Sequence, residues 1–309
     1  MTQTTSPADF AIRTDLLTRR FGKRVAVDGV NLAVPRGAIY GFIGLNGAGK
    51  STTIRMLLGL LAPSSGTAHL NGVNIAFEPV RAKSRIGYVP DRPTAYPWMR
   101  VQEVIQFCEG VLPDWSPTLA ASLLKKYRID PRAKVSKLSK GTGAKLSLLI
   151  ALAHDPQILI LDEPTDGLDP IARDEFFEEV LRASLDSPRT VLISSHSLQD
   201  IQRATDHLGF LHEGRLIYQG RTDELLGTTK RVRLLPDSPI EDAAIRRLSP
   251  DVSHIAREGR AVTITLRNFS AAAAESLRAA AHSPNLDIAD LSLDDAFKDI
   301  VKGMEATCS

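Results

Sequence analysis

The segment GLNGAGKST, Gly44–Thr52, decides the fold, because it matches the phosphate-binding pattern G-x-x-x-x-G-K-[ST]. The apolar run AIYGFIG at 38–44 predicts a buried strand before it, and TTIRMLLGLL at 52–61 has the apolar spacing of a helix after it. Glycines let the backbone wrap around a phosphate chain, to which the helix N-terminus offers N–H groups. In such a loop Lys50 reaches the β- and γ-phosphates, and the Ser51 hydroxyl ligates Mg²⁺. A tight glycine turn without a ligand is the alternative, and the strand–loop–helix order argues against it.

Two further apolar runs lead to side chains suited to hydrolysis. ILILD at 158–162 predicts a buried strand that delivers Asp162 and then Glu163 to the sheet edge where the phosphate loop lies. There Asp162 would hold Mg²⁺ through water, and Glu163 would act as general base on the attacking water. TVLISS at 190–195 leads to His196, whose imidazole would reach a γ-phosphate and orient the water. Taken alone, an acidic pair is often a strand end and a histidine is often a structural residue.

A weaker signal is LSKGT at 138–142, placed ahead of a helix. Ser139 and Gly141 would offer a hydroxyl and free N–H groups to an anion at the helix start. Taken alone, the same residues are an ordinary helix cap.

Length and composition bound the class of protein. The chain has 309 residues, of which 43% are hydrophobic and 24% are charged. That length indicates about two domains, and these fractions exclude a disordered or collagen-like chain. The net charge of +2 argues against nucleic acid as the main ligand. The two cysteines, Cys108 and Cys308, fit a reducing compartment. No apolar run approaches the roughly 20 residues of a membrane span, and no signal peptide is visible.

The patterning along the chain changes twice. Residues 1–9 form a polar tail, residues 10–226 a mixed α/β region, and residues 227–309 a small α+β appendage. In the middle region, strand-like runs extend to about Gly72, and two amphipathic helices are expected at 101–112 and 118–129. In the appendage, strands are expected at 231–236 and 261–268, with helices at 271–282 and 293–303.

Together these motifs resemble the nucleotide-binding subunit of an ABC transporter. Phosphate loop, LSKGT signature, ILILDEP, GLDP and His196 follow one another in the family's order, and the spacing from Gly141 to Asp162 is the family's usual one. The resemblance covers about residues 10–226. It implies an α/β P-loop NTPase fold with an antiparallel β subdomain and a helical subdomain at about 92–137. The small C-terminal α+β domain stands outside it.

The resemblance also implies roles for individual residues. Phe21 would stack on adenine, and His196 is the switch histidine. Ser139 and Gly141 would clasp the γ-phosphate of the opposite subunit, and Asp169 in GLDP would couple the two sites of a head-to-tail dimer that holds two ATP molecules. The expected nucleotide-binding residues are Phe21, Gly44, Leu45, Asn46, Gly47, Ala48, Gly49, Lys50, Ser51, Thr52, Ser139, Gly141 and Asp169. The expected catalytic residues are Lys50, Glu163 and His196, and the expected Mg²⁺ ligands are Ser51, Asp91 and Asp162.

Two departures from the family pattern stand in the site itself. The usual signature is LSGGQ, whereas this chain has Lys140 and Thr142 in it. The usual glutamine after the IGYVP strand is Asp91, which can accept a metal-bound water but adds negative charge beside a triphosphate. Lys140 would compensate by adding positive charge near the phosphate.

The branch of the family that this chain resembles most supplies ATPases to small exporters of drugs, antibiotics or lipid-linked compounds. LSKG at 138–141, PDW at 113–115 and the segment around Tyr96 carry that similarity. It implies a multi-spanning permease partner and a peripheral place on the cytoplasmic face of the membrane. The residues Tyr96–Met99 either contact this partner or form a satellite core of the helical subdomain. A soluble ABC-type ATPase and a weakly hydrolysing regulatory subunit are the other functions that the sequence leaves open.

Overall fold

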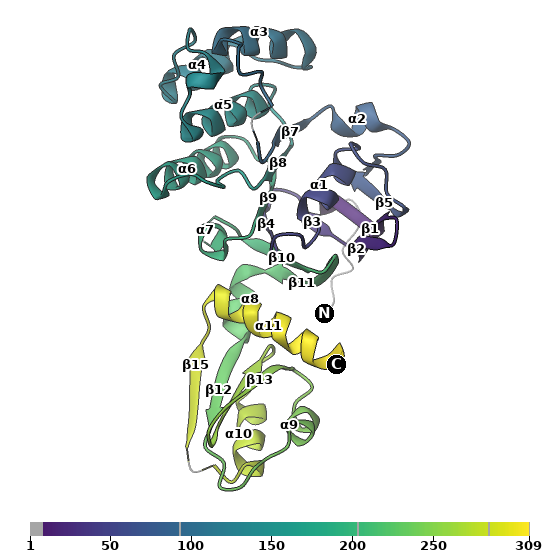
Figure 1. The fold of residues 1–309 in the computed structure, drawn as a ribbon, viewed down its shortest axis with the longest axis vertical. Helices are drawn as coiled ribbons and strands as arrows, with labels where there is room; N and C mark the ends of the chain where they lie inside the picture. Colours follow the sequence, from purple (N-terminus) through teal and green to yellow (C-terminus); the bar gives the residue numbers. More distant parts are fainter. Residues whose placement is uncertain (1–8, 93, 203, 284, 309) are drawn as a thin grey trace. The chain divides into compact units, whose positions relative to one another are not determined.

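A computed structural model describes residues 9–92, 94–202, 204–283 and 285–308, with the side chains of 199–200 and 305–308 outside the description. It divides the chain into two compact units, residues 1–219 and 220–309 (Figure 1). The predicted tail at 1–9 therefore lies almost wholly outside the described residues, as does the side chain of Cys308. The second unit begins at Gly220, earlier than the expected boundary at 226/227, because α8 (Thr222–Thr228) belongs to it.

The first unit is built around a largely parallel sheet in the order β11-β10-β4-β9-β8-β7. Every residue of β8 and β9 is buried, and most of these residues are apolar, because both faces of the sheet are covered. The strands are β4 (Ile39–Ile43), β7 (Ile86–Val89), β8 (Ile158–Asp162), β9 (Thr190–Ser195), β10 (His207–His212) and β11 (Arg215–Arg221).

Helices lie on both faces of this sheet. α5, α6 and α7 cover one face, while α1 and an antiparallel sheet cover the other (Figure 1). α5 packs against β7, α6 and α4. The helices of the first unit are α1 (Lys50–Leu57), α2 (Pro79–Lys83), α3 (Val101–Val111), α4 (Pro117–Lys126), α5 (Lys140–Leu152), α6 (Pro170–Asp186) and α7 (Leu198–Gln202). α3 and α4 lie inside the region 92–137 that was expected to be helical, and α5 follows directly.

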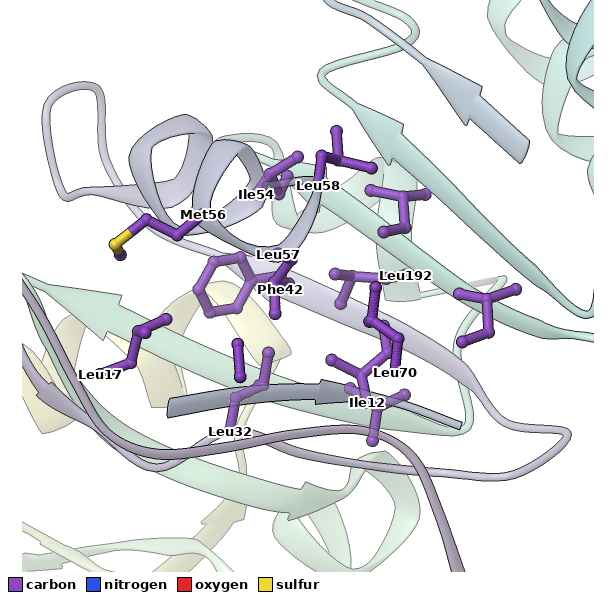
Figure 2. Packing of buried hydrophobic residues seen from close by; sticks show 14 of the residues in the cluster. Ile12, Leu17, Leu32, Phe42, Ile54, Met56, Leu57, Leu58, Leu70 and Leu192 are labelled. Atoms are coloured by element: carbon purple, nitrogen blue, oxygen red, sulfur yellow. The ribbon is translucent and has the colours of Figure 1, made fainter. Parts of the chain in front are cut away.

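The antiparallel sheet has the order β2-β1-β5-β6, and β3 also pairs with β1. Its strands are β1 (Phe10–Phe21), β2 (Arg24–Val30), β3 (Ala33–Pro35), β5 (Ser65–Leu70) and β6 (Val73–Asn74). The main core of the first unit lies between the two sheets and encloses α1, where Phe42, Leu57 and Leu192 are fully buried (Figure 2). This packing fixes the start of α1, which is the end of the phosphate loop.

Chain direction brings the expected functional segments to one edge. β4, β8 and β9 are parallel, and the register pairs Ile43 with Ser195 and Asp162 with Ser194. The loop into α1, the residues after β8 and the residues after β9 therefore all leave the sheet at its C-terminal edge, where ligands bind in open α/β sheets.

The second unit is a β-α-β-β-α-β arrangement with the sheet order β13-β14-β12-β15. Its core lies on the face where Val232, Ile264 and Leu277 are fully buried. Its elements after α8 are β12 (Lys230–Leu234), α9 (Asp242–Leu248), β13 (Val252–Glu258), β14 (Ala261–Leu266), α10 (Ala271–Ala280), β15 (Leu286–Asp290) and α11 (Leu293–Cys308). The predicted α/β class with a small α+β appendage is confirmed.

In the described part of the chain, no helix combines the length and the apolar character that crossing a bilayer requires.

Candidate active site

The phosphate loop is held tightly between β4 and α1. A Cβ atom on Gly49 would lie 2.5 Å from the carbonyl oxygen of Ala26, and the backbone φ of Gly49 is +109°, so only glycine fits there. Lys50 is 5% exposed, and its Nζ donates hydrogen bonds to the carbonyl oxygens of Gly44 (2.6 Å) and Leu45 (3.3 Å). The lysine therefore ties the start of the loop to the start of the helix.

Glu163 bridges the other two expected catalytic side chains. Its Oε1 lies 3.0 Å from Lys50 Nζ, and its Oε2 lies 2.8 Å from His196 Nδ1. The backbone N–H of His196 donates to the same Oε2 at 3.3 Å. Glu163 has φ +47°, a sparsely populated conformation for a non-glycine residue, and its own N–H donates to Ser194 Oγ at 2.9 Å. The three side chains are thus brought together, with the glutamate in the middle.

Asp162 lies beneath the loop and is 1% exposed. Its Oδ1 accepts hydrogen bonds from Ser194 Oγ (2.7 Å) and Ser51 Oγ (3.1 Å). Burial raises the pKa of this carboxyl above its usual value, and the two serine hydrogen bonds oppose that shift. The bonds therefore help to keep a buried carboxylate charged.

These groups open into a pocket of about 410 Å³, here called the phosphate-loop pocket. Phe21 stands at its rim, 48% exposed, with the Arg19 guanidinium 4.6 Å from its ring centroid. Asp91 is exposed and also lines the pocket. The expected residues that line it are Phe21, Asn46, Gly47, Gly49, Lys50, Ser51, Thr52, Asp91, Glu163 and His196.

The remaining expected residues lie elsewhere. Gly44 contributes its carbonyl to Lys50, and Leu45 and Ala48 line an adjoining pocket on the other side of the loop. Ser139 Oγ accepts from the Thr142 N–H at 3.1 Å and caps α5, and Asp169 Oδ1 accepts from the Ala172 N–H at 2.9 Å and caps α6. Ser139, Gly141 and Asp169 are absent from the lining of the phosphate-loop pocket described for this single chain.

Four residues of the site were not expected from the sequence, and one of them, Ala26, lines the phosphate-loop pocket. Ser194 holds both Asp162 and the backbone of Glu163, and Arg24 and Asp166 line the phosphate-loop pocket. A serine inside an otherwise apolar buried strand was a usable signal for Ser194, since a buried hydroxyl needs a partner. Arg24 carries no local motif that singles it out.

The site offers hard oxygen ligands to a cation but no complete cage. Ser51 lines the phosphate-loop pocket, and its Oγ donates to Asp162 Oδ1 at 3.1 Å. Within the described ranges, no cluster of three or more His, Cys, Asp and Glu side chains is arranged to hold a metal ion. This donor set fits Mg²⁺, which keeps several waters and takes one or two protein ligands together with phosphate oxygens.

A second pocket, of about 320 Å³, lies beside the first and is here called the apolar pocket. Tyr88, Tyr96, Met99 and Phe107 are among its lining residues. The rings of Tyr96 and Trp98 stack at 4.7 Å, and both are mainly exposed, at 58% and 68%. Tyr96 and Trp98 are therefore not buried in a satellite core.

Comparison with known proteins gives consistent matches. Residues 27–166 match a family model described as ABC transporter. The chain is 37% identical over 216 residues to the bacitracin transport ATP-binding protein BcrA of Bacillus licheniformis, covering 69% of this chain and 71% of that protein. It is 38% identical over 215 residues to the Nod factor export ATP-binding protein I of Ralstonia nicotianae, covering 68% and 67%. A solved ATP binding subunit of an ABC transporter superposes with a TM-score of 0.63 at 28% identity, covering 70% of this chain and 91% of that one.

Proposed function

The chain belongs to the ABC transporter family of ATP-binding subunits and is an ATPase, and from this premise we propose that it powers a membrane exporter of a small molecule, an antibiotic or a lipid-like compound. Relatives named for bacitracin transport, Nod factor export and multidrug transport support this assignment.

The observation that carries the proposal is the position of Glu163. Its carboxylate contacts Lys50 through one oxygen and His196 through the other, at the mouth of the phosphate loop. Because a carboxylate only accepts hydrogen bonds, His196 Nδ1 is the donor in this contact. Glu163 takes the proton of the attacking water, His196 fixes the orientation of that carboxylate, and Lys50 holds the phosphates.

ATP and Mg²⁺ are the proposed ligands of the phosphate-loop pocket. Backbone N–H groups of the loop and Lys50 bind the phosphates, Phe21 takes the adenine, and Ser51, Asp162 and Asp91 hold the metal. When bound, the metal neutralises charge on the phosphates. Ser194 keeps Asp162 positioned and charged for this role through its 2.7 Å hydrogen bond.

The complete site is proposed to form in a head-to-tail dimer, whether of two identical or of two related ATPase chains. Ser139, Gly141 and Asp169 lie away from the phosphate-loop pocket of their own chain, and Ser139 and Asp169 cap helices that start at the surface. In the dimer, Ser139 and Gly141 act on the γ-phosphate bound by the opposite chain, and ATP binding closes the two chains on each other.

The proposed membrane partner is a separate multi-spanning permease whose cytoplasmic helix docks at the apolar pocket. Exposed Tyr96 and Trp98, with Phe107 at 62% exposed, offer the aromatic surface typical of interface cores. This contact would place the chain on the cytoplasmic face of the membrane.

Hydrolysis by the purified chain tests the proposal. We expect Mg²⁺-dependent ATP hydrolysis that falls by about 10²–10⁴-fold in Glu163→Gln, the contribution of a general base, while ATP still binds. The neighbouring Asp166→Asn, which removes another carboxylate of the same pocket, is the matched control and should retain most of the activity. Equal loss in both variants, or unchanged turnover in Glu163→Gln, would contradict the assigned role.

A further inference from the structure

Lys140 lines the apolar pocket and contacts the turn that carries two residues of the phosphate-loop pocket. It lines the apolar pocket together with Ser139. The far end of the same side chain lies across Gly167, where a Cβ would be 2.8 Å from Lys140 Nζ and 3.9 Å from its Cδ and Cε. Gly167 has φ +69° and no side chain, which is what allows the lysine to lie there.

Gly167 belongs to the turn at 163–168, which serves the phosphate-loop pocket. The turn begins at Glu163 and includes Asp166, and both of these side chains line that pocket. Its backbone is closed by the Asp166 N–H donating to the Glu163 carbonyl at 3.1 Å and by the Leu168 N–H donating to the Thr165 carbonyl at 3.1 Å. A shift of Glu163 or Asp166 is therefore carried to Gly167 through the backbone.

On the other side, Lys140 is the first residue of α5, a helix that lines the apolar pocket. Gly143, Leu146 and Ile150 follow it at helical spacing along the same pocket wall. A shift of Lys140 is therefore carried along this wall, since the helix moves as a rigid element.

Lys140 has no anchor that would make it independent of this turn. Its side chain is exposed, and among the residues described it makes no ion pair or side-chain hydrogen bond. Its charge stands at the N-terminus of α5, where the helix dipole disfavours a cation. The contact with the turn is thus what places the lysine.

We propose that Lys140 is a positioning residue that couples the two pockets, so that nucleotide in the phosphate-loop pocket changes the conformation at the apolar pocket, and a partner helix in the apolar pocket changes nucleotide affinity by the same factor. The inference rests on the proposed docking of the permease at the apolar pocket. It gives Lys140, which stands where the usual signature has glycine, a function within its own chain.

Trp98 supplies a reporter that needs no permease. The chain has two tryptophans, so Trp115→Phe leaves Trp98, stacked on Tyr96 at the apolar pocket, as the only one. In this parent chain, the Mg²⁺ complex of a non-hydrolysable ATP analogue should change Trp98 emission. Lys140→Ala should bind the analogue with similar affinity and lose most of the change. Lys137→Ala, an equal loss of charge on a residue outside both pocket linings, should keep it.

A double-mutant cycle with Gly167→Ala tests the contact itself. The added methyl displaces Lys140, so Gly167→Ala should reduce the emission change in the parent and have little further effect when Lys140 is already alanine. An undiminished change in Lys140→Ala would overturn the inference and assign the signal to the Asp91–Trp98 segment. An equal effect of Gly167→Ala in both backgrounds would also overturn it, since backbone strain alone would then be the cause. If the analogue leaves Trp98 emission unchanged in the parent chain, the inference is also overturned. ATP hydrolysis by the unmodified chain would then still support the proposed function.

Discussion

The phosphate-loop pocket and the apolar pocket have volumes of about 410 and 320 Å³ and are lined by different kinds of side chain. In the first, Lys50, Glu163 and Asp162 are buried or nearly so, and each is held by hydrogen bonds or ion pairs of 2.6–3.3 Å. In the second, the lining residue Tyr96 is mainly exposed and stacks on Trp98, which is mainly exposed as well. The side chains of the first pocket are fixed by polar contacts in the ligand-free chain, whereas the second presents exposed apolar surface.

This difference implies that the two pockets respond differently to substitution. A change in the phosphate-loop pocket removes an atom with a defined partner, and hydrolysis should fail in the isolated chain. A change in the apolar pocket should leave the isolated chain almost unaffected and alter only its response to a membrane partner.

Lys50→Ala should have the largest effect. It removes the ammonium that contacts Glu163 and two loop carbonyls, so both the phosphate-binding charge and the shape of the loop are lost. We expect ATP turnover to fall at least about 100-fold, with weakened nucleotide binding, because a site that acts as a unit loses most of its activity with one member. Steady-state kinetics measures the turnover, and equilibrium binding measures the nucleotide affinity. Lys137→Ala removes the same charge outside the two pockets and is the control. Similar losses in Lys50→Ala and Lys137→Ala would contradict the assigned role of Lys50.

Trp98→Ala should separate coupling from catalysis. The side chain is 68% exposed, so its removal should leave thermal stability and basal ATP hydrolysis close to those of the parent. Stimulation of hydrolysis by the reconstituted permease should fall by about tenfold, within the usual range for coupling between sites. Unfolding of the variant, detected by a large drop in the melting temperature, would instead mark Trp98 as a core residue.

Ser194→Ala should produce a smaller, pH-dependent effect. Burial already raises the pKa of Asp162, and the Ser194 hydrogen bond lowers it, so the variant should raise that pKa further. The protonated carboxyl cannot hold Mg²⁺, and the acid limb of Mg²⁺-dependent hydrolysis should therefore move upward by roughly half a pH unit or more. A folded-state pKa above the unfolded value also means that Asp162 costs stability at neutral pH, and this cost disappears as the pH falls through the folded-state pKa.

Ser195→Ala is the matched control for the pH profile. The Ser195 hydroxyl donates to the carbonyl of Ser197 rather than to Asp162, so its loss should leave the acid limb in place. An unshifted profile in Ser194→Ala would mean that Asp162 does not control metal binding.

The sequence predicted those parts of the site that depend on local patterns. The phosphate loop has its own motif. The runs that became β8 and β9 are mainly apolar, so their ends located Asp162, Glu163 and His196 at one sheet edge. Arg24 and Asp166 were missed because only the fold brings β2 and the turn after Glu163 to the loop. The placement of Ser139, Gly141 and Asp169 against a second chain stays a prediction.

In the second unit too, the sequence predicted only the strands that have a clear local pattern. The run AVTITL was recognised as β14 because its apolar residues are buried. β15, LDIAD at 286–290, was missed because it is a short edge strand with four exposed residues. Its place in the sheet comes from pairing with β12, which is a non-local interaction.

The central claim is that this ATPase acts on a membrane partner through its apolar pocket. The most direct measurement is affinity purification of the tagged chain from mild-detergent membranes of its own cells, with Trp98→Ala in parallel and the co-purifying chains identified. We expect a protein with several membrane-spanning segments to co-purify in stoichiometric amount, and less of it to co-purify with Trp98→Ala. A chain that stays in the soluble fraction, or that brings down ribosomes or DNA-repair proteins in both forms, would contradict it.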